Sequence, residues 1–243
     1  MRTWTSSPIE PRRNVLLATL EPMDLESLAD HLEPVSIDYR EVLYRPNEPL
    51  SHVYFPVSGM VSIVAVSAAG ASVEVGPVGS DGMVGLPVYL GAGSDPLQAF
   101  VQVPPCLALR LAAEHFRDAV ERLPTLQRNM RLYVHWTYTS MAQWILCARL
   151  HPAEERMARW LLMCHERVNQ NTFPLTHEFL AQMVGVRRAT VTLAAGALQR
   201  AGLAIFRRGL VTIPDPRALE EAACECYGVL KAEYTRLFGR PPE

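Results

Sequence analysis

Residues 176–213 combine cations with a recognisable spacing of apolar residues, in a segment whose pattern predicts a helix, a tight turn, a second helix and a hairpin. Thr176 suits the N-cap of the first helix, because its hydroxyl can accept a hydrogen bond from a first-turn amide. Gly185 permits the turn that follows, and Gly202 ends the second helix. Two alternating runs around Arg207-Arg208-Gly209 then predict a β-hairpin with a basic tip. This order is that of a winged helix-turn-helix.

The charge of this segment favours double-stranded DNA as its partner. It holds five arginines against one acid, a net +4 with histidine neutral, whereas the whole chain carries −2. Side chains at the start of the second helix reach base edges, and a hairpin tip flanks phosphates. A small helical hairpin with a solvated basic face is the plainer alternative. The residues expected to contact DNA are Thr176, Arg187, Arg188, Ala189, Thr190, Thr192, Arg200, Arg207 and Arg208.

Length and composition are those of a globular protein with room for two modest domains. The 243 residues are 49% hydrophobic and 20% charged, and no apolar run approaches the roughly 20 residues that a membrane span needs. Residues 1–13 lack the apolar core of a signal peptide and are expected to form a disordered tail. We therefore expect a cytoplasmic protein with no membrane partner.

The five cysteines are scattered and contain no Cys-x-x-Cys pair. Cys224 and Cys226 are the only close pair, and no second pair matches them. The sequence therefore predicts reduced thiols, with no structural zinc or iron–sulfur site. We expect no metal, no cofactor and no catalytic residues.

The fold class expected is α+β, with a sheet domain over residues 14–123, a long helix over 124–151 and a winged domain with a helical extension over 152–243. Short β-rich runs separated by turn-forming stretches predict seven or eight strands in a β-sandwich or jelly-roll barrel. These runs are Val35–Tyr39, Glu41–Tyr44, His52–Val57, Gly59–Val66, Ser72–Val78, Phe100–Val103 and Cys106–Leu111. Further helices are expected over Ala153–Val168 and Ala218–Phe238.

The long helix is predicted because residues 125–151 contain no Gly or Pro. Roughly 25 residues would span about 38 Å. Apolar residues at three-and-four spacing predict a coiled-coil-like seam, which favours a homodimer. The alternative is that this stripe packs on the sheet domain of its own chain. The seam residues are Leu126, Met130, Val134, Thr137, Met141, Trp144 and Ala148.

This order of elements, together with the stretch LTHEFLAQMVGVRRATV at 175–191, resembles the CRP/FNR family of bacterial transcription regulators. The resemblance covers about residues 15–215. Tyr54–Val61 is similar to the family's strand–Gly–strand hairpin, and Val78–Leu86 to the start of its ligand cassette. The family implies that a signal bound in the barrel reorients the two winged domains of a dimer, each placing its second helix in a major groove of a palindromic site. An activator would also contact RNA polymerase.

The ligand cassette departs from that of the cyclic-nucleotide-binding members. Those members carry a Glu for the ribose and an Arg followed by Ser or Thr for the phosphate. Here Gly85 lies near the first position, and no cation exists between Arg45 and Arg110. A buried phosphodiester without a cationic partner is costly, so we expect no cyclic AMP binding of the usual kind. An apolar or neutral ligand could occupy a pocket lined by Val61, Ile63, Val73, Gly85, Leu86 and Leu90.

The second helix of the winged domain departs as well. The family commonly begins it with Ser-Arg-Glu-Thr, and this chain has Arg187-Arg188-Ala189-Thr190. The resemblance implies that Arg188 forms bidentate hydrogen bonds with guanine. Ala189 replaces the Glu that accepts from cytosine, and Arg187 stands where Ser or Thr would cap the helix. Thr190, Arg200 and Arg208 are then expected at phosphates.

Other sensing chemistries and other functions stay open as alternatives. The first cysteine is Cys106, so the N-terminal cluster of the iron–sulfur members is absent. Haem ligation or thiol sensing would use some of His31, His52, His115, His135, Cys106, Cys147 and Cys164. The barrel could also have lost its ligand and serve only as a platform for dimerisation and polymerase contact. A cupin-like enzyme is disfavoured, because His52 and Glu74 stand alone without a His-x-His pair.

Overall fold

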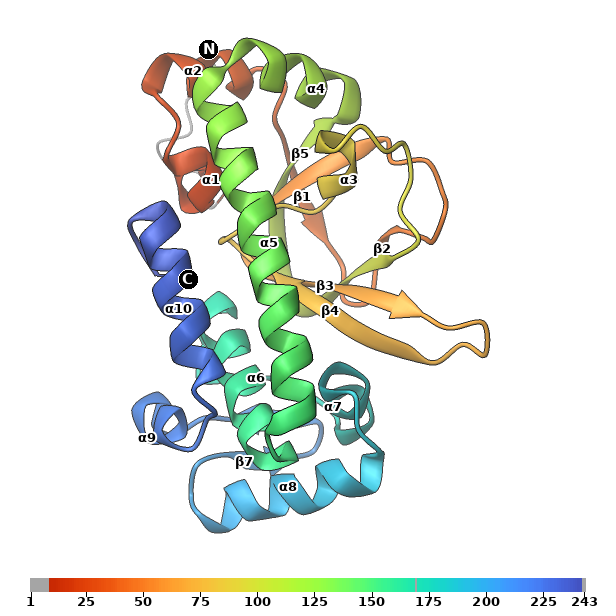
Figure 1. Ribbon diagram of the computed structural model, residues 1–243, viewed down its shortest axis with the longest axis vertical. Coiled ribbons are helices and arrows are strands. Elements are labelled where there is room, and N and C mark those ends of the chain that lie inside the picture. Colours follow the sequence, from red (N-terminus) through yellow and green to blue (C-terminus); the bar gives the residue numbers. More distant parts are fainter. Residues whose placement is uncertain (1–8, 169, 242–243) are drawn as a thin grey trace.

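One long helix, α5 (Pro124–Leu150), runs between a curved antiparallel sheet and a C-terminal helix (Figure 1). The computed structural model describes residues 9–168 and 170–241. Residues 1–8 of the expected tail therefore lie outside the described residues. The rest of that prediction is wrong, because Pro11–Arg13 form a short 3-10 helix whose Pro11 is buried. No helix in the described parts of the chain has the length and apolarity needed to cross a membrane.

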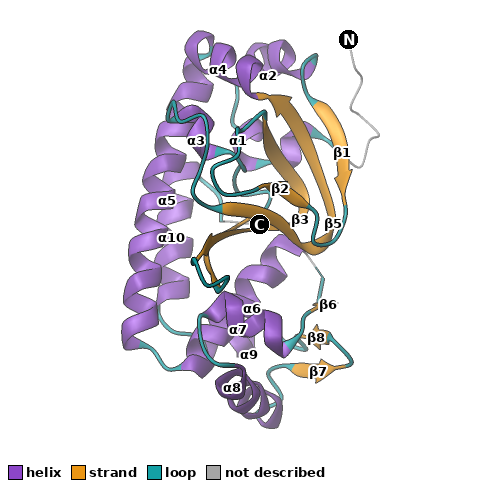
Figure 2. Ribbon diagram, turned by 90° about the vertical axis from the view of Figure 1, so that its right-hand side faces the viewer, coloured by secondary structure: helices purple, strands orange, loops and turns teal. Residues whose placement is uncertain are grey.

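The sheet domain has five antiparallel strands in the described residues. The order is β1-β5-β3-β4, and β2 pairs with β5 at one end. Their bounds are β1 (Glu33–Ile37), β2 (Val42–Tyr44), β3 (His52–Val66), β4 (Ser72–Val78) and β5 (Gln98–Ala112). Figure 2 shows how the long strands β3 and β5 curve across this domain.

The expected seven or eight short strands are too many, because β3 and β5 each join two of the predicted runs. Gly59 lies inside β3 with φ 75°, and the register with β5 shifts between Pro56 and Met60. A Cβ at Gly59 would lie 2.6 Å from the carbonyl oxygen of Pro105 on β5. The turn-like composition had suggested that a strand ends here. Glycine instead lets the strand bend at a bulge and continue.

Short helices cover the edges of the sheet and share its core. They are α1 (Val15–Ala18), α2 (Pro22–Ala29), α3 (Leu86–Tyr89) and α4 (Ala113–Arg122). The core includes Phe55 and Leu109 from the sheet and Phe116 from α4. The first turns of α5 add Leu126 and Met130, both fully buried in their own chain.

The C-terminal part contains a helix bundle with a three-stranded sheet, in the order β6-β8-β7. Its elements are α6 (Ala153–Val168), β6 (Thr172–Pro174), α7 (His177–Val184), α8 (Arg188–Arg200), β7 (Ile205–Arg207) and β8 (Leu210–Thr212). The helix predicted over Ala153–Val168 matches α6. Trp160, Phe173 and Leu180 are among the buried residues that hold these elements together.

The predicted helix over Ala218–Phe238 is wrong as a single element. It is divided into α9 (Pro216–Glu221) and α10 (Cys226–Phe238). Helix α10 then runs beside α5 toward the sheet domain (Figures 1 and 2). Its Tyr234 packs edge-on against Trp136 of α5 at 5.2 Å between ring centroids, within the core of the sheet domain. The C-terminal helix therefore packs with the sheet domain, although the chain reaches it from the winged domain.

Candidate nucleic-acid interface

Helices α7 and α8 form the expected helix-turn-helix, and local chemistry accounts for their ends. The hydroxyl of Thr176 accepts a 3.2 Å hydrogen bond from the amide of Phe179, which caps α7. Gly185 ends α7 in the left-handed conformation, at φ 69°. Arg187 occupies the N-cap of α8 without a side-chain cap, so its guanidinium is not used to start the helix.

Helix α8 separates a buried face from a basic, exposed start. Val191, Ala194 and Leu198 are buried against the rest of the winged domain. Arg187, Arg188 and Ala189 are exposed, and Thr190 is half-buried. The side chains predicted to meet bases therefore project away from the core that holds the helix.

The wing is a tight hairpin whose turn consists of Arg208 and Gly209. Both residues have positive φ angles, 50° and 77°, as a type I′ turn requires. A left-handed conformation costs a residue other than glycine on the order of 1 kcal/mol. The exposed side chain of Arg208 therefore stands at the tip of the wing, in a conformation that glycine or asparagine would adopt at lower cost.

A groove of about 440 Å³ joins the start of α7, one face of α8 and the wing. It is lined by five of the predicted residues, namely Thr176, Arg188, Thr192, Arg207 and Arg208. The wing is held against α8 because the amide of Phe206 donates a 3.0 Å hydrogen bond to Oε1 of Gln199. The ring of Phe206 also packs edge-on against His177, at 5.5 Å between centroids.

Two of the predicted residues are less well placed than the others. Arg200 is twelve residues along α8 from Arg188, about 18 Å at the helical rise of 1.5 Å per residue. The hydroxyl of Thr192 donates a 3.1 Å hydrogen bond to the carbonyl of Arg188 within the same helix. The structure thus gathers Thr176, Arg188, Thr192, Arg207 and Arg208 in one groove, and Arg200 is not among the residues that line it.

With this geometry in place, the chain matches known families in both of its parts. Residues 34–123 match the cyclic nucleotide-binding domain, and residues 155–222 match the Crp-like helix-turn-helix domain. The chain belongs to the CRP/FNR family of bacterial transcription regulators. The relatives of this CRP/FNR chain are regulators, which fits the prediction that it is not an enzyme.

Individual relatives of this CRP/FNR chain are distant in sequence and close in fold. The global nitrogen regulator of Synechocystis sp. is 23% identical over 197 residues, 76% of this chain and 86% of the relative. FixK2 from Bradyrhizobium japonicum superposes with a TM-score of 0.67 at 17% identity, over 79% of this chain and 98% of that structure. A CRP/FNR-family regulator from Eubacterium rectale gives 0.65 at 19% identity, over 85% and 96%.

The six residues predicted to line an effector pocket do not converge on one cavity. Val61 is buried in the sheet core and Leu86 packs against it, while Leu90 is 60% exposed. Ile63 is half-buried, and Gly85 forms the N-cap of α3 in a left-handed conformation, at φ 98°. Val73 lines a cavity that contains none of the other five.

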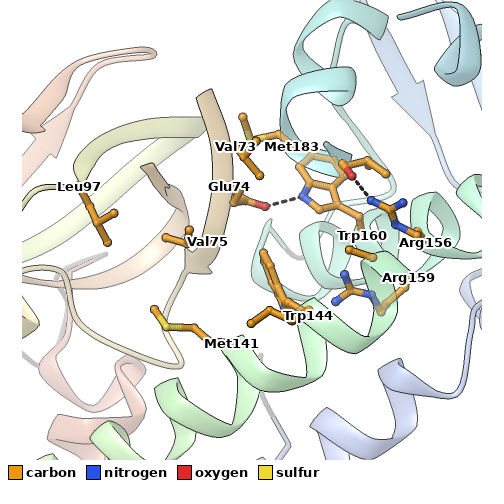
Figure 3. Close-up of a pocket in the computed structure, with 13 residues that line it drawn as sticks. Val73, Glu74, Val75, Leu97, Met141, Trp144, Arg156, Arg159, Trp160 and Met183 are labelled. Atoms are coloured by element: carbon orange, nitrogen blue, oxygen red, sulfur yellow. Dashed lines mark hydrogen bonds between the residues drawn. The ribbon is translucent and has the colours of Figure 1, made fainter. Parts of the chain in front are cut away.

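That cavity, of about 440 Å³, lies where β4, α5, α6 and α7 meet (Figure 3). Its walls are mainly apolar, but the carboxyl group of Glu74 forms part of them. Glu74 accepts a 2.7 Å hydrogen bond from Nε1 of Trp160 on α6 and a 2.5 Å hydrogen bond from the hydroxyl of Ser62 on β3. Burial raises the pKa of Glu74 to about 7, and the two hydrogen bonds oppose that shift.

Two arginines of α6 bring positive charge to this cavity. The guanidinium of Arg159 lies over the ring of Trp144, 5.1 Å from its centroid. The guanidinium of Arg156 donates to the carbonyl oxygen of Val184 at the end of α7 (Figure 3). Sequence reasoning missed both, because it looked for a cation only within the sheet domain.

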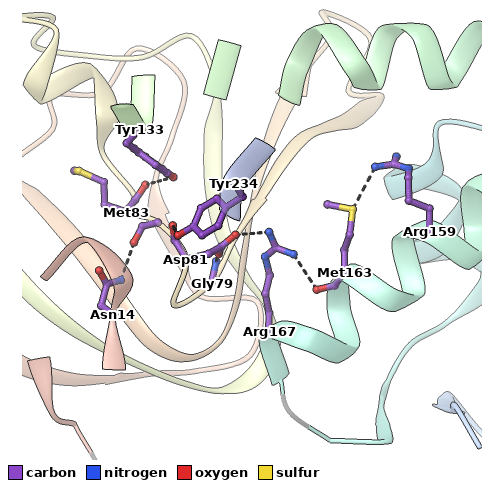
Figure 4. Close-up of polar contacts among 10 residues, drawn as sticks. Asn14, Gly79, Asp81, Met83, Tyr133, Arg159, Met163, Arg167 and Tyr234 are labelled. Atoms are coloured by element: carbon purple, nitrogen blue, oxygen red, sulfur yellow. Dashed lines mark hydrogen bonds and ion pairs between the residues drawn. The ribbon is translucent and has the colours of Figure 1, made fainter. Parts of the chain in front are cut away.

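The start of the ligand cassette is held by side chains from several distant elements (Figure 4). Asp81 forms a buried ion pair with Arg167 of α6, and its backbone carbonyl accepts a 2.6 Å hydrogen bond from Tyr234 of α10. Tyr133 of α5 donates to the carbonyl of Met83, and Asn14 donates to that of Gly82, at 3.2 and 2.8 Å. Helix α6 therefore connects this loop directly to the winged domain.

The predicted dimer seam divides between two environments. Leu126 and Met130 lie in the core of their own chain, so they are unavailable to a second copy and that part of the prediction is corrected. Val134, Thr137 and Trp144 are half-buried, whereas Met141 and Ala148 are exposed. Sequence reasoning missed Tyr138 and Ile145, which are 74% and 69% exposed and continue the three-and-four spacing.

The residues considered for other sensing chemistries are dispersed. Cys106 and Cys164 lie singly in the two apolar cores, and burial raises the pKa of each thiol, to about 12 for Cys106. His31 and His115 stack on one another at 4.3 Å between ring centroids. His135 pairs with Glu233, and His52 contacts Ser51. Of the residues considered for these chemistries, Cys147 is the one that lies in a cluster of potential metal ligands.

Proposed function

We propose that the protein is a homodimeric, sequence-specific DNA-binding transcription regulator. The observation that supports this most directly is the shared groove of Arg188, Arg207 and Arg208 on α8 and the wing. A DNA duplex would lie against this groove, with Arg188 at a base pair and the wing arginines at phosphates. The bacterial regulator would act in the cytoplasm and would have no enzymatic activity.

We propose that two copies pair along an apolar stripe of α5. The stripe consists of the half-buried Val134 and the exposed Tyr138, Met141, Ile145 and Ala148. Its spacing of four, three, four and three residues is that of a two-stranded helix seam. A symmetric pair would present two α8 helices to successive major grooves of a palindromic site. An activator of this kind would add a contact with RNA polymerase.

We propose that the effector binds in the cavity lined by Glu74 and Arg159. It does not bind at the cassette that the cyclic-nucleotide-binding members use. The cassette contains no Lys or Arg of its own, and the Arg167 that reaches it is paired with Asp81, whereas the cavity is bordered by Arg156 and Arg159. Its walls come from both the sheet domain and the winged domain, so a ligand there would change the free energy of their arrangement. A second candidate function is that the sheet domain binds no effector and serves only as a platform for dimerisation and polymerase contact.

One experiment separates these possibilities. Duplexes selected from a random pool by the purified protein are tested for binding by fluorescence anisotropy, with and without cyclic AMP. We expect selection of a palindromic motif and no effect of cyclic AMP. Failure to enrich any motif contradicts a sequence-specific regulator, and binding that requires cyclic AMP contradicts our reading of the cassette. Small anionic apolar compounds that change the affinity would distinguish a sensor from a platform.

A further inference from the structure

Four potential metal ligands meet where α5 ends and α10 begins. Cys147 lies in the last turn of α5, and His151 is the residue that caps this helix. Cys224 lies in the break between α9 and α10, and Cys226 is the first residue of α10. The three cysteines are buried and form a cluster of their own, separate from both apolar cores.

The donor atoms already have the spacing of a coordination sphere. The Sγ atoms of Cys147 and Cys224 are 3.4 Å apart, and Sγ of Cys226 is 3.5 Å from Nδ1 of His151. All four donor atoms lie within 4.8 Å of one another. Tetrahedral zinc with Zn–S bonds of about 2.3 Å places its sulfur ligands about 3.7 Å apart, so a small movement of the side chains would complete the site.

The surroundings orient the ligands for an ion. The Nε2 atom of His151 lies 3.0 Å from the carboxylate of Glu225, which holds the proton on Nε2 and leaves Nδ1 free to bind metal. The side-chain amide of Gln143 donates a 3.1 Å hydrogen bond to Sγ of Cys226. Such outer contacts are typical of metal-binding histidines and thiolates.

Packing alone does not account for this arrangement. The other two cysteines, Cys106 and Cys164, each lie singly among apolar side chains. The break at residues 222–225 interrupts the C-terminal helix and turns both Cys224 and Cys226 toward α5. The i, i+4 spacing of Cys147 and His151 places them on the same face of that helix end.

We propose that Cys147, His151, Cys224 and Cys226 bind one Zn²⁺ ion in a closed tetrahedral site. Three thiolates and an imidazole form a donor set that favours zinc, and the four protein ligands leave no position for water or substrate. The site would therefore be structural. It would tie α10 to the end of α5, directly before the chain enters α6. This proposal departs from the expectation that the chain has no metal site, and it does not depend on the proposed function.

The first test is the metal content of the full chain, purified without an affinity tag and measured by mass spectrometry of the elements. We expect one zinc ion per chain in the wild type and in the matched control Cys106→Ala, and a loss of zinc in Cys224→Ala. A wild-type protein that takes up no zinc after reconstitution with Zn²⁺ overturns the proposal. So does a Cys224→Ala variant that keeps its zinc.

A second test uses only the wild-type chain and is independent of whether a variant folds. The reduced, metal-free protein is titrated with Co²⁺ alone. We expect thiolate-to-cobalt charge-transfer bands and intense tetrahedral ligand-field bands that saturate at one equivalent, and X-ray absorption of the zinc form should show three sulfur ligands and one nitrogen ligand. Octahedral cobalt, an iron–sulfur cluster at these residues, or a Cys147–Cys224 disulfide in the freshly purified protein overturns the assignment.

Discussion

The indole Nε1 of Trp160 donates a 2.7 Å hydrogen bond to the buried carboxyl group of Glu74, so one polar contact joins α6 of the winged domain to β4 of the sheet domain. It lies in the wall of the cavity that we propose as the effector site. The hydroxyl of Ser62 donates a hydrogen bond to the same carboxyl group and also contacts the side chain of Gln102 on β5. The protonation state of Glu74 therefore bears on the junction of the two domains.

We expect the stability of the protein to fall as the pH rises through the range in which Glu74 ionises. Because burial raises the pKa of Glu74 from 4.5 to about 7, the folded state holds a proton between these values that the unfolded state has released. The contribution of Glu74 to the free energy of unfolding should therefore be highest below pH 4.5, decline by on the order of 3 kcal/mol between about pH 4.5 and pH 7, and level off above pH 7. Groups that act on or contact this carboxyl are Ser62, Trp160, Arg159, Arg167 and Cys164.

Urea denaturation across this pH range tests the prediction. Glu74→Gln should flatten the decline, because its side chain does not titrate, whereas the exposed control Glu26→Gln should keep it. A wild-type decline that persists unchanged in Glu74→Gln would assign the pH dependence to another group.

Arg188→Ala should weaken binding to the selected DNA site by about 1–3 kcal/mol and relax the sequence preference. The reason is that a bidentate hydrogen-bonding partner for one base would be lost from the exposed start of α8. Competition binding on the selected site and on random duplexes measures both effects. Arg200→Ala, at the far end of the same helix, is the matched control; as an expected phosphate contact it should weaken binding to both kinds of DNA equally and leave the sequence preference unchanged. Equal losses of affinity on both kinds of DNA would contradict a base-reading role for Arg188.

Arg208→Asn should weaken binding to all sequences by a similar factor and reduce the slope of affinity against salt concentration by about one counterion. Asparagine tolerates the left-handed conformation at φ 50°, so the two-residue turn with Gly209 is retained. Titrations at several salt concentrations give the slope, and circular dichroism checks the fold. An unchanged slope would mean that the wing tip makes no phosphate contact.

Tyr138→Glu should convert the dimer into monomers. Tyr138 is 74% exposed and is the most exposed aromatic residue of the apolar stripe, and a pair of carboxylates buried there would cost at least about 2 kcal/mol, or roughly thirtyfold in the dissociation constant. Sedimentation velocity over a range of concentrations measures this. Val229→Glu, which replaces an exposed apolar residue of α10, should leave the dimer intact. A monomeric wild type, or a dimer that tolerates Tyr138→Glu, would place the interface elsewhere.

Asp81→Asn should lower the free energy of unfolding by about 3–5 kcal/mol, because it leaves the guanidinium of Arg167 buried without its counterion. The exposed substitution Asp118→Asn on α4 serves as the control and should be close to neutral. Chemical denaturation of the three proteins gives the values. A loss below 1 kcal/mol would show that the ion pair contributes little to the connection between α6 and the cassette loop.

The elements that could be predicted from sequence are those whose ends are set by adjacent residues. Thr176 and Gly185 define α7 through a cap and a left-handed turn, and the basic hairpin follows from the pattern around Gly209. The strands were harder, because Gly59 marks a bulge inside β3 and not a turn between two strands. Composition alone does not distinguish the two.

What could not be predicted depends on residues that are distant in sequence. The cavity receives its arginines from α6, about eighty residues after Glu74, and no local pattern joins them. The cluster of Cys147, His151, Cys224 and Cys226 was hidden because it combines one helix end with a break in another helix. Two local signals were present, a Cys and a His four residues apart and a Cys-x-Cys pair, but neither is specific alone.

The return of α10 to the sheet domain restricts how the two domains can move relative to one another. A single connection from α5 into α6 would permit rotation about any axis through that point. The chain crosses the boundary a second time, however, and Leu230, Tyr234 and Phe238 are embedded in the core of the sheet domain. The second crossing starts beside the first, because Cys224 and Cys226 at the start of α10 meet Cys147 and His151 at the end of α5. A signal that reorients α8 must therefore turn the winged domain about this junction, at the cost of its contacts with the sheet domain, or release α10 from the sheet-domain core.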